Sequence, residues 1–180
     1  MLTGGRADVR ETAEGISIKV ASPDQQPIST IIALKFAGSV MELPAVSLGG
    51  GSLAEGANAT ASNVFLHNPH FAASAAVDGD EETRWATDAG TRQAWLEVDL
   101  GKVCTFSRVR IDEWADGGKR IQSFELQARN GGEWTTFHRG TTIGPNMECT
   151  ITPVTARQLR LNILNATEGP TINEFQIFPK

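Results

Sequence analysis

The sequence predicts an all-β fold, an antiparallel sandwich or jelly roll. Short stretches in which apolar and polar residues alternate recur along the chain, and this period-2 pattern is typical of strands with one buried face. Turn sequences rich in glycine, asparagine or proline separate these stretches. No segment longer than about ten residues keeps the 3.6-residue period of an amphipathic helix. Short strands with frequent turns favour a sandwich.

The N-terminal residues 1–46 predict a small β-strand remnant. Residues 16–20 (ISIKV) alternate as a half-buried strand does, and residues 28–36 are apolar and β-branched like a second strand. A lone pair of strands is marginally stable in water, so this piece needs a partner. Residues 47–56 (SLGGGSLAEG) are rich in glycine and serine, which indicates a linker.

The remaining residues, 57–180, predict the main domain. Its expected strands are centred on residues 95–100, 109–112, 124–127, 159–163 and 175–178. Residues 71–77 could form one short helical turn.

The composition excludes several classes of protein. The 180 residues contain 16 Lys and Arg against 21 Asp and Glu, a net charge of −5, which argues against a broad surface for nucleic acid or an anionic membrane. No apolar run approaches the roughly 20 residues that span a bilayer. Two cysteines are too few for a disulfide scaffold. Residues 1–10 lack the features of a secretory signal.

The most informative segment is residues 75–85 (AAVDGDEETRW), which crowds four carboxylates and a hydroxyl around one glycine. Carboxylates this close repel one another unless a positive charge lies among them. Ca²⁺ takes six to eight oxygen ligands from such groups, and a turn at Gly79 would bring them together. The spacing differs from an EF-hand loop, and a solvated acidic turn is the alternative.

Four motifs resemble the factor V/VIII type C (discoidin) family, which includes the family 32 carbohydrate-binding modules. They are residues 76–85 (AVDGDEETRW), 95–102 (WLEVDLGK), 153–161 (PVTARQLRL) and 173–175 (NEF), in the family's order. The resemblance implies a galactose-binding-like jelly roll of about eight strands with a bound Ca²⁺. It also implies the ion's ligands: Ala75, Asp78, Asp80, Thr83, the Asn173 carbonyl and Glu174. The ion would then tie the acidic loop to the last strand and stabilise the fold.

The tryptophans suggest where a ligand binds. Trp85, Trp95 and Trp134 occupy family positions that pack in the core or at its edges. Trp114 follows the strand over residues 109–112 and is expected on a loop, beside Glu113 and Arg120. An exposed aromatic ring can stack on the C–H groups of a pyranose while charged neighbours bind its hydroxyls. The alternative is a tryptophan that caps the sandwich edge.

Two further pairs of residues, one of histidines and one of cysteines, could carry chemistry. His67 and His70 lie around Pro69, which disfavours the helix that a metal pair at that spacing needs. A sugar contact by His67 fits a loop better than a metal site does, and a plain surface histidine is the alternative. Cys104 and Cys149 are expected as buried free thiols, with a bridge possible if their strands are neighbours.

The chain is not expected to be an enzyme. Its best carboxylate cluster looks like a cation site, and no catalytic triad, phosphate loop or Cys–His pair stands out. Residues 8–18 and 27–34 resemble the β-sandwich tail of family 29 α-L-fucosidases, and residues 111–113 and 170–175 resemble their appended C-terminal module. The barrel that carries that family's catalytic residues is absent from this sequence.

Together these features predict a non-catalytic, Ca²⁺-containing carbohydrate-binding accessory module from the C-terminal part of an α-L-fucosidase-like glycoside hydrolase. The expected partner is a glycan that contains galactose, fucose or N-acetyl sugars, with no nucleic acid or membrane partner. The protein is expected to be a monomer in an extracellular or periplasmic location. The alternative is a discoidin-type adhesion module that binds lipid or protein.

Overall fold

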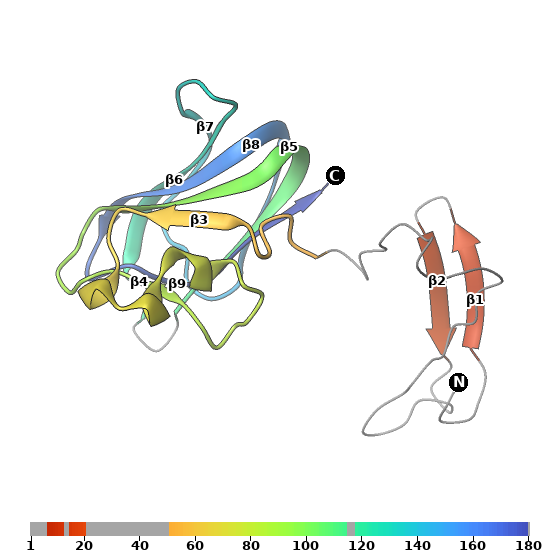
Figure 1. Cartoon of the computed structure of the whole chain (residues 1–180), viewed down its shortest axis with the longest axis horizontal. Coiled ribbons are helices and arrows are strands. Elements are labelled where there is room, and N and C mark those ends of the chain that lie inside the picture. The colour runs from red at the N-terminus through yellow and green to blue at the C-terminus, as the bar shows by residue number, and fades with distance from the viewer. Residues whose placement is uncertain (1–6, 13–14, 21–50, 115–117, 180) are drawn as a thin grey trace. The chain divides into compact units, whose positions relative to one another are not determined.

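A computed structural model describes residues 7–12, 15–20, 51–114 and 118–179. The chain forms two compact units, Met1–Val46 and Ser47–Lys180 (Figure 1). In the first, β1 (Ala7–Thr12) pairs antiparallel with β2 (Gly15–Val20). The strand predicted over residues 16–20 is therefore confirmed, whereas β1 was not predicted. The strand predicted over residues 28–36 lies outside the described residues.

The second unit is built from antiparallel strands and three short 3₁₀ helices. The strands are β3 (Asn58–Ala61), β4 (Trp85–Ala86), β5 (Ala94–Glu113), β6 (Ile121–Arg129), β7 (Thr135–Gly140), β8 (Met147–Ala166) and β9 (Thr171–Pro179). The helices are η3 (Phe65–His67), η4 (Pro69–Phe71) and η5 (Ala73–Ala76), which cover the region of the predicted helical turn.

The two long strands β5 and β8 pass through both layers of a sandwich (Figure 1). The first half of β5 pairs with β3 and with the second half of β8, which continues to β6 and β7. The second half of β5 pairs with the first half of β8 and with β9, which continues to β4. The pairing register of β5 with β8 shifts between Asp99 and Cys104, where Gly101 takes a φ of 74°. The predicted all-β sandwich is confirmed.

The core lies between these layers and follows the alternation seen in the sequence. Leu96 and Val98 in β5, Phe124 and Leu126 in β6, and Leu159, Leu161 and Ile163 in β8 are all buried. Their polar neighbours along each strand are partly or fully exposed. The period-2 pattern therefore sets which face of each strand turns inward.

The predicted linker over residues 47–56 is wrong in its second half. Ala54 is fully buried, and the Leu53 N–H donates to the Ile177 carbonyl at 2.6 Å. The Ser52 hydroxyl oxygen accepts from the Ile177 N–H at 2.9 Å. Ser52 and Leu53 therefore pair with β9, which the composition of the segment alone did not indicate.

The two cysteines are both free. The β5–β8 register places Cys104 opposite Ala156 and Cys149 opposite Val109, so these two thiols do not form a bridge. Burial raises the pKa of the Cys149 thiol. The expectation of free thiols is confirmed, although both are only partly buried.

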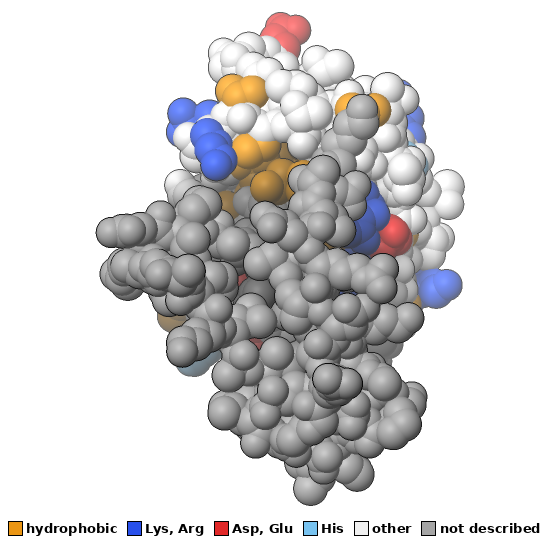
Figure 2. Space-filling view, turned by 90° about the vertical axis from the view of Figure 1, so that its right-hand side faces the viewer, with side chains coloured by type: hydrophobic (Ala, Val, Ile, Leu, Met, Phe, Trp, Pro, Cys, Tyr) orange, Lys and Arg blue, Asp and Glu red, His pale blue; other side chains and the backbone are white. Residues whose placement is uncertain are grey.

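The visible face of the described residues has no large patch of side chains that carry the same charge (Figure 2). On the face shown in Figure 2, the described residues present basic and acidic side chains scattered among apolar ones. Among the described residues, no helix has the length and apolar character needed to cross a bilayer.

Gly140 at the end of β7 tests how tightly the core is packed. A Cβ at this position would overlap the ring of Phe124, which is buried and cannot swing away. Gly140→Ala should therefore lower the free energy of unfolding by about 1–3 kcal/mol, the usual cost of overpacking. Chemical denaturation measures this change.

Gly132→Ala is the matched control, because nothing lies within 4 Å of its Cβ position. It should leave stability nearly unchanged. Equal stability of the two variants would contradict the packing described here.

Candidate functional site

Three consecutive residues, Thr83, Arg84 and Trp85, connect the acidic loop, a surface cavity and the core. The Thr83 hydroxyl lies among oxygen atoms of the acidic loop, and Arg84 lines a surface cavity. Trp85 is fully buried, and its indole N–H donates to the Asn63 carbonyl at 2.9 Å. The core therefore anchors a segment that is shared by two candidate sites.

The first candidate site is a cluster of oxygen atoms around the Thr83 hydroxyl. Its Oγ lies 3.1 Å from the Ala75 carbonyl, 2.9 Å from each carboxylate oxygen of Asp78 and 3.0 Å from the Asp80 carbonyl. One hydroxyl carries a single hydrogen and can satisfy only one of these four acceptors. The cluster therefore holds more acceptor oxygens than the Thr83 hydroxyl can satisfy.

Glu174 of β9 completes this cluster. One carboxylate oxygen accepts from the Gly79 N–H at 3.0 Å, and the residue is 2% exposed. Burial, together with the neighbouring charge of Asp78, raises the pKa of Glu174 to about 7. Two carboxyl groups from distant parts of the chain thus face each other, and no ion pair to Lys or Arg balances either one among the described residues.

The chemistry of this donor set fits a hard cation such as Ca²⁺. All the atoms that could bind the metal are oxygens, and they belong to carbonyl and hydroxyl groups as well as to carboxylates. The described residues contain no group of three or more His, Cys, Asp or Glu placed to hold a metal, so a carboxylate-only cage is not present there.

The predicted metal ligands Ala75, Asp78, Thr83 and Glu174 lie in or beside this cluster, whereas Asp80 and Asn173 make other contacts with their side chains. The Asn173 side-chain amide donates to the Glu81 and Thr83 carbonyls at 2.8 and 3.2 Å and so ties the loop to β9. The Asp80 carboxylate instead accepts from the Glu82 N–H, so Asp80 offers the cluster its carbonyl. Metal binding itself stays a prediction.

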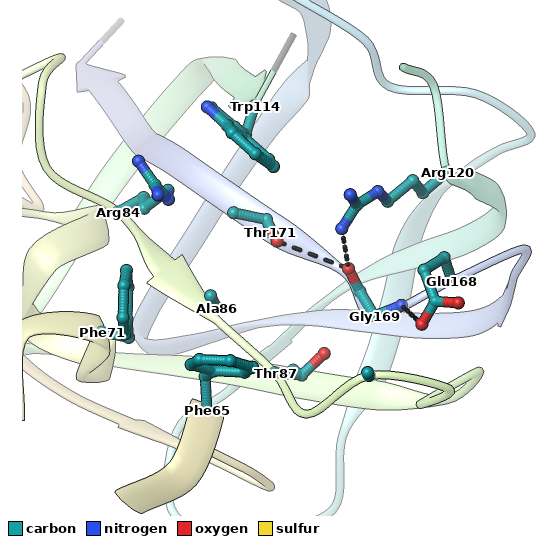
Figure 3. Close-up of a pocket in the computed structure, with 11 residues that line it drawn as sticks. Phe65, Phe71, Arg84, Ala86, Thr87, Trp114, Arg120, Glu168, Gly169 and Thr171 are labelled. Atoms are coloured by element: carbon teal, nitrogen blue, oxygen red, sulfur yellow. Dashed lines mark hydrogen bonds between the residues drawn. The ribbon is translucent and has the colours of Figure 1, made fainter. Parts of the chain in front are cut away.

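The second candidate site is an open cavity of about 270 Å³ (Figure 3). It lies where β4, the end of β5 and the turn before β9 meet η3 and η4. Its walls are Phe65, Phe71, Arg84, Ala86, Thr87, Ala89, Trp114, Arg120, Glu168, Gly169 and Thr171. Aromatic side chains thus line a hollow with charged groups around it, as in many small-ligand sites.

Cations flank Trp114 in this cavity. The guanidinium carbon of Arg84 lies 4.5 Å from the Trp114 ring centroid and 5.3 Å from that of Phe71. The guanidinium carbon of Arg120 lies 5.4 Å from the Trp114 centroid, and its Nη1 donates to the Gly169 carbonyl at 2.9 Å. Trp114 and Arg120, two of the predicted ligand-binding residues, therefore line the same cavity, and ligand binding there stays a prediction.

Glu168 is the cavity's carboxylate, and sequence analysis missed it. Its Oε1 accepts from the N–H groups of Gly90 and Gly169, and these two hydrogen bonds hold the pKa of the carboxyl group below its usual value. The residue therefore stays ionised at neutral pH and can accept hydrogen bonds. Its only sequence signal was a turn, Glu168-Gly169-Pro170.

Phe65, Phe71 and Arg84 were also missed. The two rings meet edge to face with centroids 5.5 Å apart. They lie on the 3₁₀ helices η3 and η4, whose irregular backbone has no sequence period. Arg84 was seen only as part of the acidic motif.

One predicted ligand-binding residue, Glu113, is corrected, and the role of another, His67, stays a prediction. Glu113 is 1% exposed, and its oxygens accept from the N–H groups of Arg120, Ile121 and Gly144 at 2.7–2.9 Å. This carboxylate is therefore committed to the backbone and unavailable to a sugar. His67 is exposed but does not line the cavity, although it follows Phe65 by two residues.

The other tryptophans differ in burial. Trp85 is in the core, as expected. Trp95 and Trp134 are half-buried, and the Arg160 guanidinium carbon lies 5.3 and 4.3 Å from their ring centroids.

Comparison with known proteins decides the family. A family model for the F5/8 type C domain matches residues 58–175, most of the second unit. The chain belongs to the F5/8 type C domain family. The match spans the acidic loop and strands β3 to β8, and ends within β9.

The F5/8 type C domain also resembles glycoside-hydrolase proteins. A protein of Oryza sativa subsp. japonica named as an alpha-L-fucosidase is 30% identical over 129 residues, which are 71% of this chain and 25% of that protein. The chain thus spans about a quarter of the length of this curated relative.

Two solved structures share the architecture. The GH29 fucosidase E1_10125 of Ruminococcus gnavus, in its D221A form with fucose, is 31% identical with a TM-score of 0.66, over 72% of this chain and 26% of that one. Chitosan-binding module 1 from a chitosanase/glucanase of Paenibacillus sp. IK-5 is 31% identical with a TM-score of 0.64, over 71% and 98%.

Replacing Glu113 tests its structural role. Glu113→Gln puts an amide NH₂ where one oxygen accepts backbone hydrogen bonds, so at least one buried N–H loses its acceptor. We expect the free energy of unfolding to fall by about 2–3 kcal/mol, because bonds to charged acceptors are the stronger ones. Denaturant titration measures the loss.

Glu125→Gln provides the comparison, since the partner side chain of Glu125, Arg139, is 72% exposed. It should cost no more than about 1 kcal/mol. Native stability of Glu113→Gln would contradict the assignment.

Proposed function

We propose that the F5/8 type C domain is a non-catalytic carbohydrate-binding module that holds a sugar in the cavity around Trp114. The observation that carries this proposal is the cavity itself, with three aromatic rings and ionised groups in its lining. The likeness to a chitosan-binding module and to a fucosidase supports it.

Each part of the cavity has a role in this recognition. The rings of Phe65, Phe71 and Trp114 offer apolar surface for the C–H groups of a pyranose. The ionised Glu168 accepts hydrogen bonds from hydroxyls, and Arg120 lies opposite it across the Gly169 turn (Figure 3). A volume of about 270 Å³ is just below the range of about 300–1,000 Å³ typical of drug-sized ligands, which suits one sugar ring.

The proposed module belongs to an α-L-fucosidase-like glycoside hydrolase that acts outside the cytoplasm. Its task is to keep an attached catalytic domain near a glycan that contains galactose, fucose or N-acetyl sugars. Attachment turns a second binding event into an intramolecular one and so raises effective concentration. The likeness to the rice protein supports this placement.

The proposal includes a structural Ca²⁺ in the oxygen cluster. The carbonyls of Ala75 and Asp80, the hydroxyl of Thr83 and the carboxylates of Asp78 and Glu174 would hold it, with Asn173 tying the loop to β9. A divalent charge there would neutralise the two facing carboxylates. The surrounding residues would then fix the segment from Asp78 to Trp85.

Trp114→Ala tests the sugar site. Removing this ring should weaken sugar binding at least about tenfold, which corresponds to roughly 1.4 kcal/mol, because buried aromatic anchors carry much of the binding energy. Isothermal titration or affinity electrophoresis against a glycan panel measures the change.

Trp134→Ala serves as the control. Trp134 lies beside Arg129 and Arg160 and does not line the cavity, so its removal should leave affinity unchanged. Equal affinity of Trp114→Ala and the native protein would contradict the proposed site. Binding to lipid vesicles in co-sedimentation, without sugar binding, would favour the adhesion alternative.

Calcium removal tests the oxygen cluster. At a calcium concentration of about 100 times Kd, the ion adds about 2.7 kcal/mol to native stability, so a chelator should lower the melting temperature by roughly 5–10 °C. Asp78→Ala should abolish this calcium dependence.

Asp80→Asn is the matched variant. Because Asp80 offers its carbonyl, this change should keep most of the dependence on calcium. A melting temperature that is the same with calcium and with chelator would contradict the metal proposal.

A further inference from the structure

We propose that the cavity prefers a sugar that carries an anionic group, a carboxylate or a sulfate, and that Arg84 receives this group. The inference rests on the proposed sugar-binding function and specifies the ligand of the same site.

The position of Arg84 is set by its two neighbours in the chain. The Thr83 hydroxyl lies in the oxygen cluster, and the Trp85 ring is locked into the core. The backbone between them is therefore fixed, and the Arg84 side chain extends to the cavity wall between Phe71 and Trp114 (Figure 3).

The guanidinium of Arg84 is stacked but not hydrogen-bonded. It contacts the rings of Trp114 and Phe71, with centroid distances of 4.5 and 5.3 Å. Among the described residues it makes no hydrogen bond or ion pair. Stacking uses the flat faces of a guanidinium and leaves its in-plane N–H donors for a ligand or water, and that fork fits a carboxylate or sulfate bidentately.

The charges within the cavity favour an anion. Two guanidinium groups, those of Arg84 and Arg120, share its lining with one carboxylate, Glu168. The charge of Glu168 is already stabilised by the N–H groups of Gly90 and Gly169. The Arg84 guanidinium is therefore not paired with the Glu168 carboxylate, and an anionic ligand can meet its charge, although the protein as a whole carries −5.

Arg84 also has acidic neighbours outside this cavity. A neighbouring hollow is lined by Glu81, Glu82, Asp112 and Glu113. Arg110 contacts Glu81 and Asp112 at 3.3 and 3.4 Å, and Glu113 is bonded to the backbone. These acids restrict the approach of an anion to the cavity side, where the aromatic rings lie.

Isothermal titration with matched sugars tests the preference. The probes are the methyl glycosides of galactose, galacturonic acid, glucose and glucuronic acid, and galactose 6-sulfate, at low ionic strength. We expect each acidic sugar to bind at least tenfold more tightly than its neutral counterpart. The preference should shrink as salt is added, because charge attraction is screened. Comparison of the uronic acids with the sulfate shows which anion fits better.

The variant Arg84→Gln should bring the ratio of acidic to neutral affinity close to one, and Arg84→Lys should keep part of it. Arg108→Gln is the control, because Arg108 also stacks on an aromatic ring, that of Phe178 at 4.0 Å, but lies outside the cavity lining. It should leave the ratio unchanged. Thermal melting establishes that each variant is folded, and the salt series on the native protein does not depend on any variant.

The possible outcomes separate this inference from the proposed function. Equal binding of acidic and neutral sugars would overturn the inference and leave the sugar site standing. A preference for acids that persists in Arg84→Gln would overturn the role of Arg84. Failure of the folded native protein to bind any of the sugars would count against the proposed function itself.

Discussion

The arrangement of both candidate sites depends on the attachment of the acidic loop to the last strand. Glu174 and Asn173 of β9 bond to the loop through the Gly79 N–H and the carbonyls of Glu81 and Thr83. These contacts join positions 90 to 95 residues apart in the sequence. The loop then leads directly into Arg84 and buried Trp85, so the same attachment that gathers the oxygen atoms also orients one wall of the cavity.

A second buried carboxylate organises the other wall. Glu113 ends β5 and accepts hydrogen bonds from the N–H groups of Arg120, Ile121 and Gly144. It therefore fixes the chain on both sides of the loop that follows Trp114. Glu113 directly precedes Trp114 and accepts a hydrogen bond from the Arg120 backbone. It therefore positions two residues of the cavity without lining the cavity itself. The two buried acids differ in one respect: among the described residues Glu113 accepts three backbone N–H groups, whereas Glu174 accepts one, that of Gly79.

Much of the fold could be predicted because apolar and polar residues alternate along the strands. The candidate site could be predicted only in part. The phase of Val109 and Ile111 already placed Glu113 on the inward face, and following that phase one step further would have shown its burial. Phe65, Phe71 and Glu168 carry no such signal, because they lie in 3₁₀ helices and a turn, where neighbours in space are not related by any period. The nearness of Glu174 to the acidic loop was expected from a family resemblance and not from spacing, because the two are far apart in the sequence.

The small size of the cavity limits the affinity with which it could bind a sugar without help from another domain. A hollow that suits one sugar ring offers few atoms for contact, and binding must still overcome the loss of translational and rotational freedom. Such a site gains most when it is tethered, because attachment supplies the proximity that weak contacts cannot. A weak site also selects by chemistry more than by area, since one well-placed guanidinium changes the relative affinity of two sugars that cover the same surface. In the proposed module, the aromatic walls would thus provide retention on a glycan, and Arg84 would decide which glycan is retained.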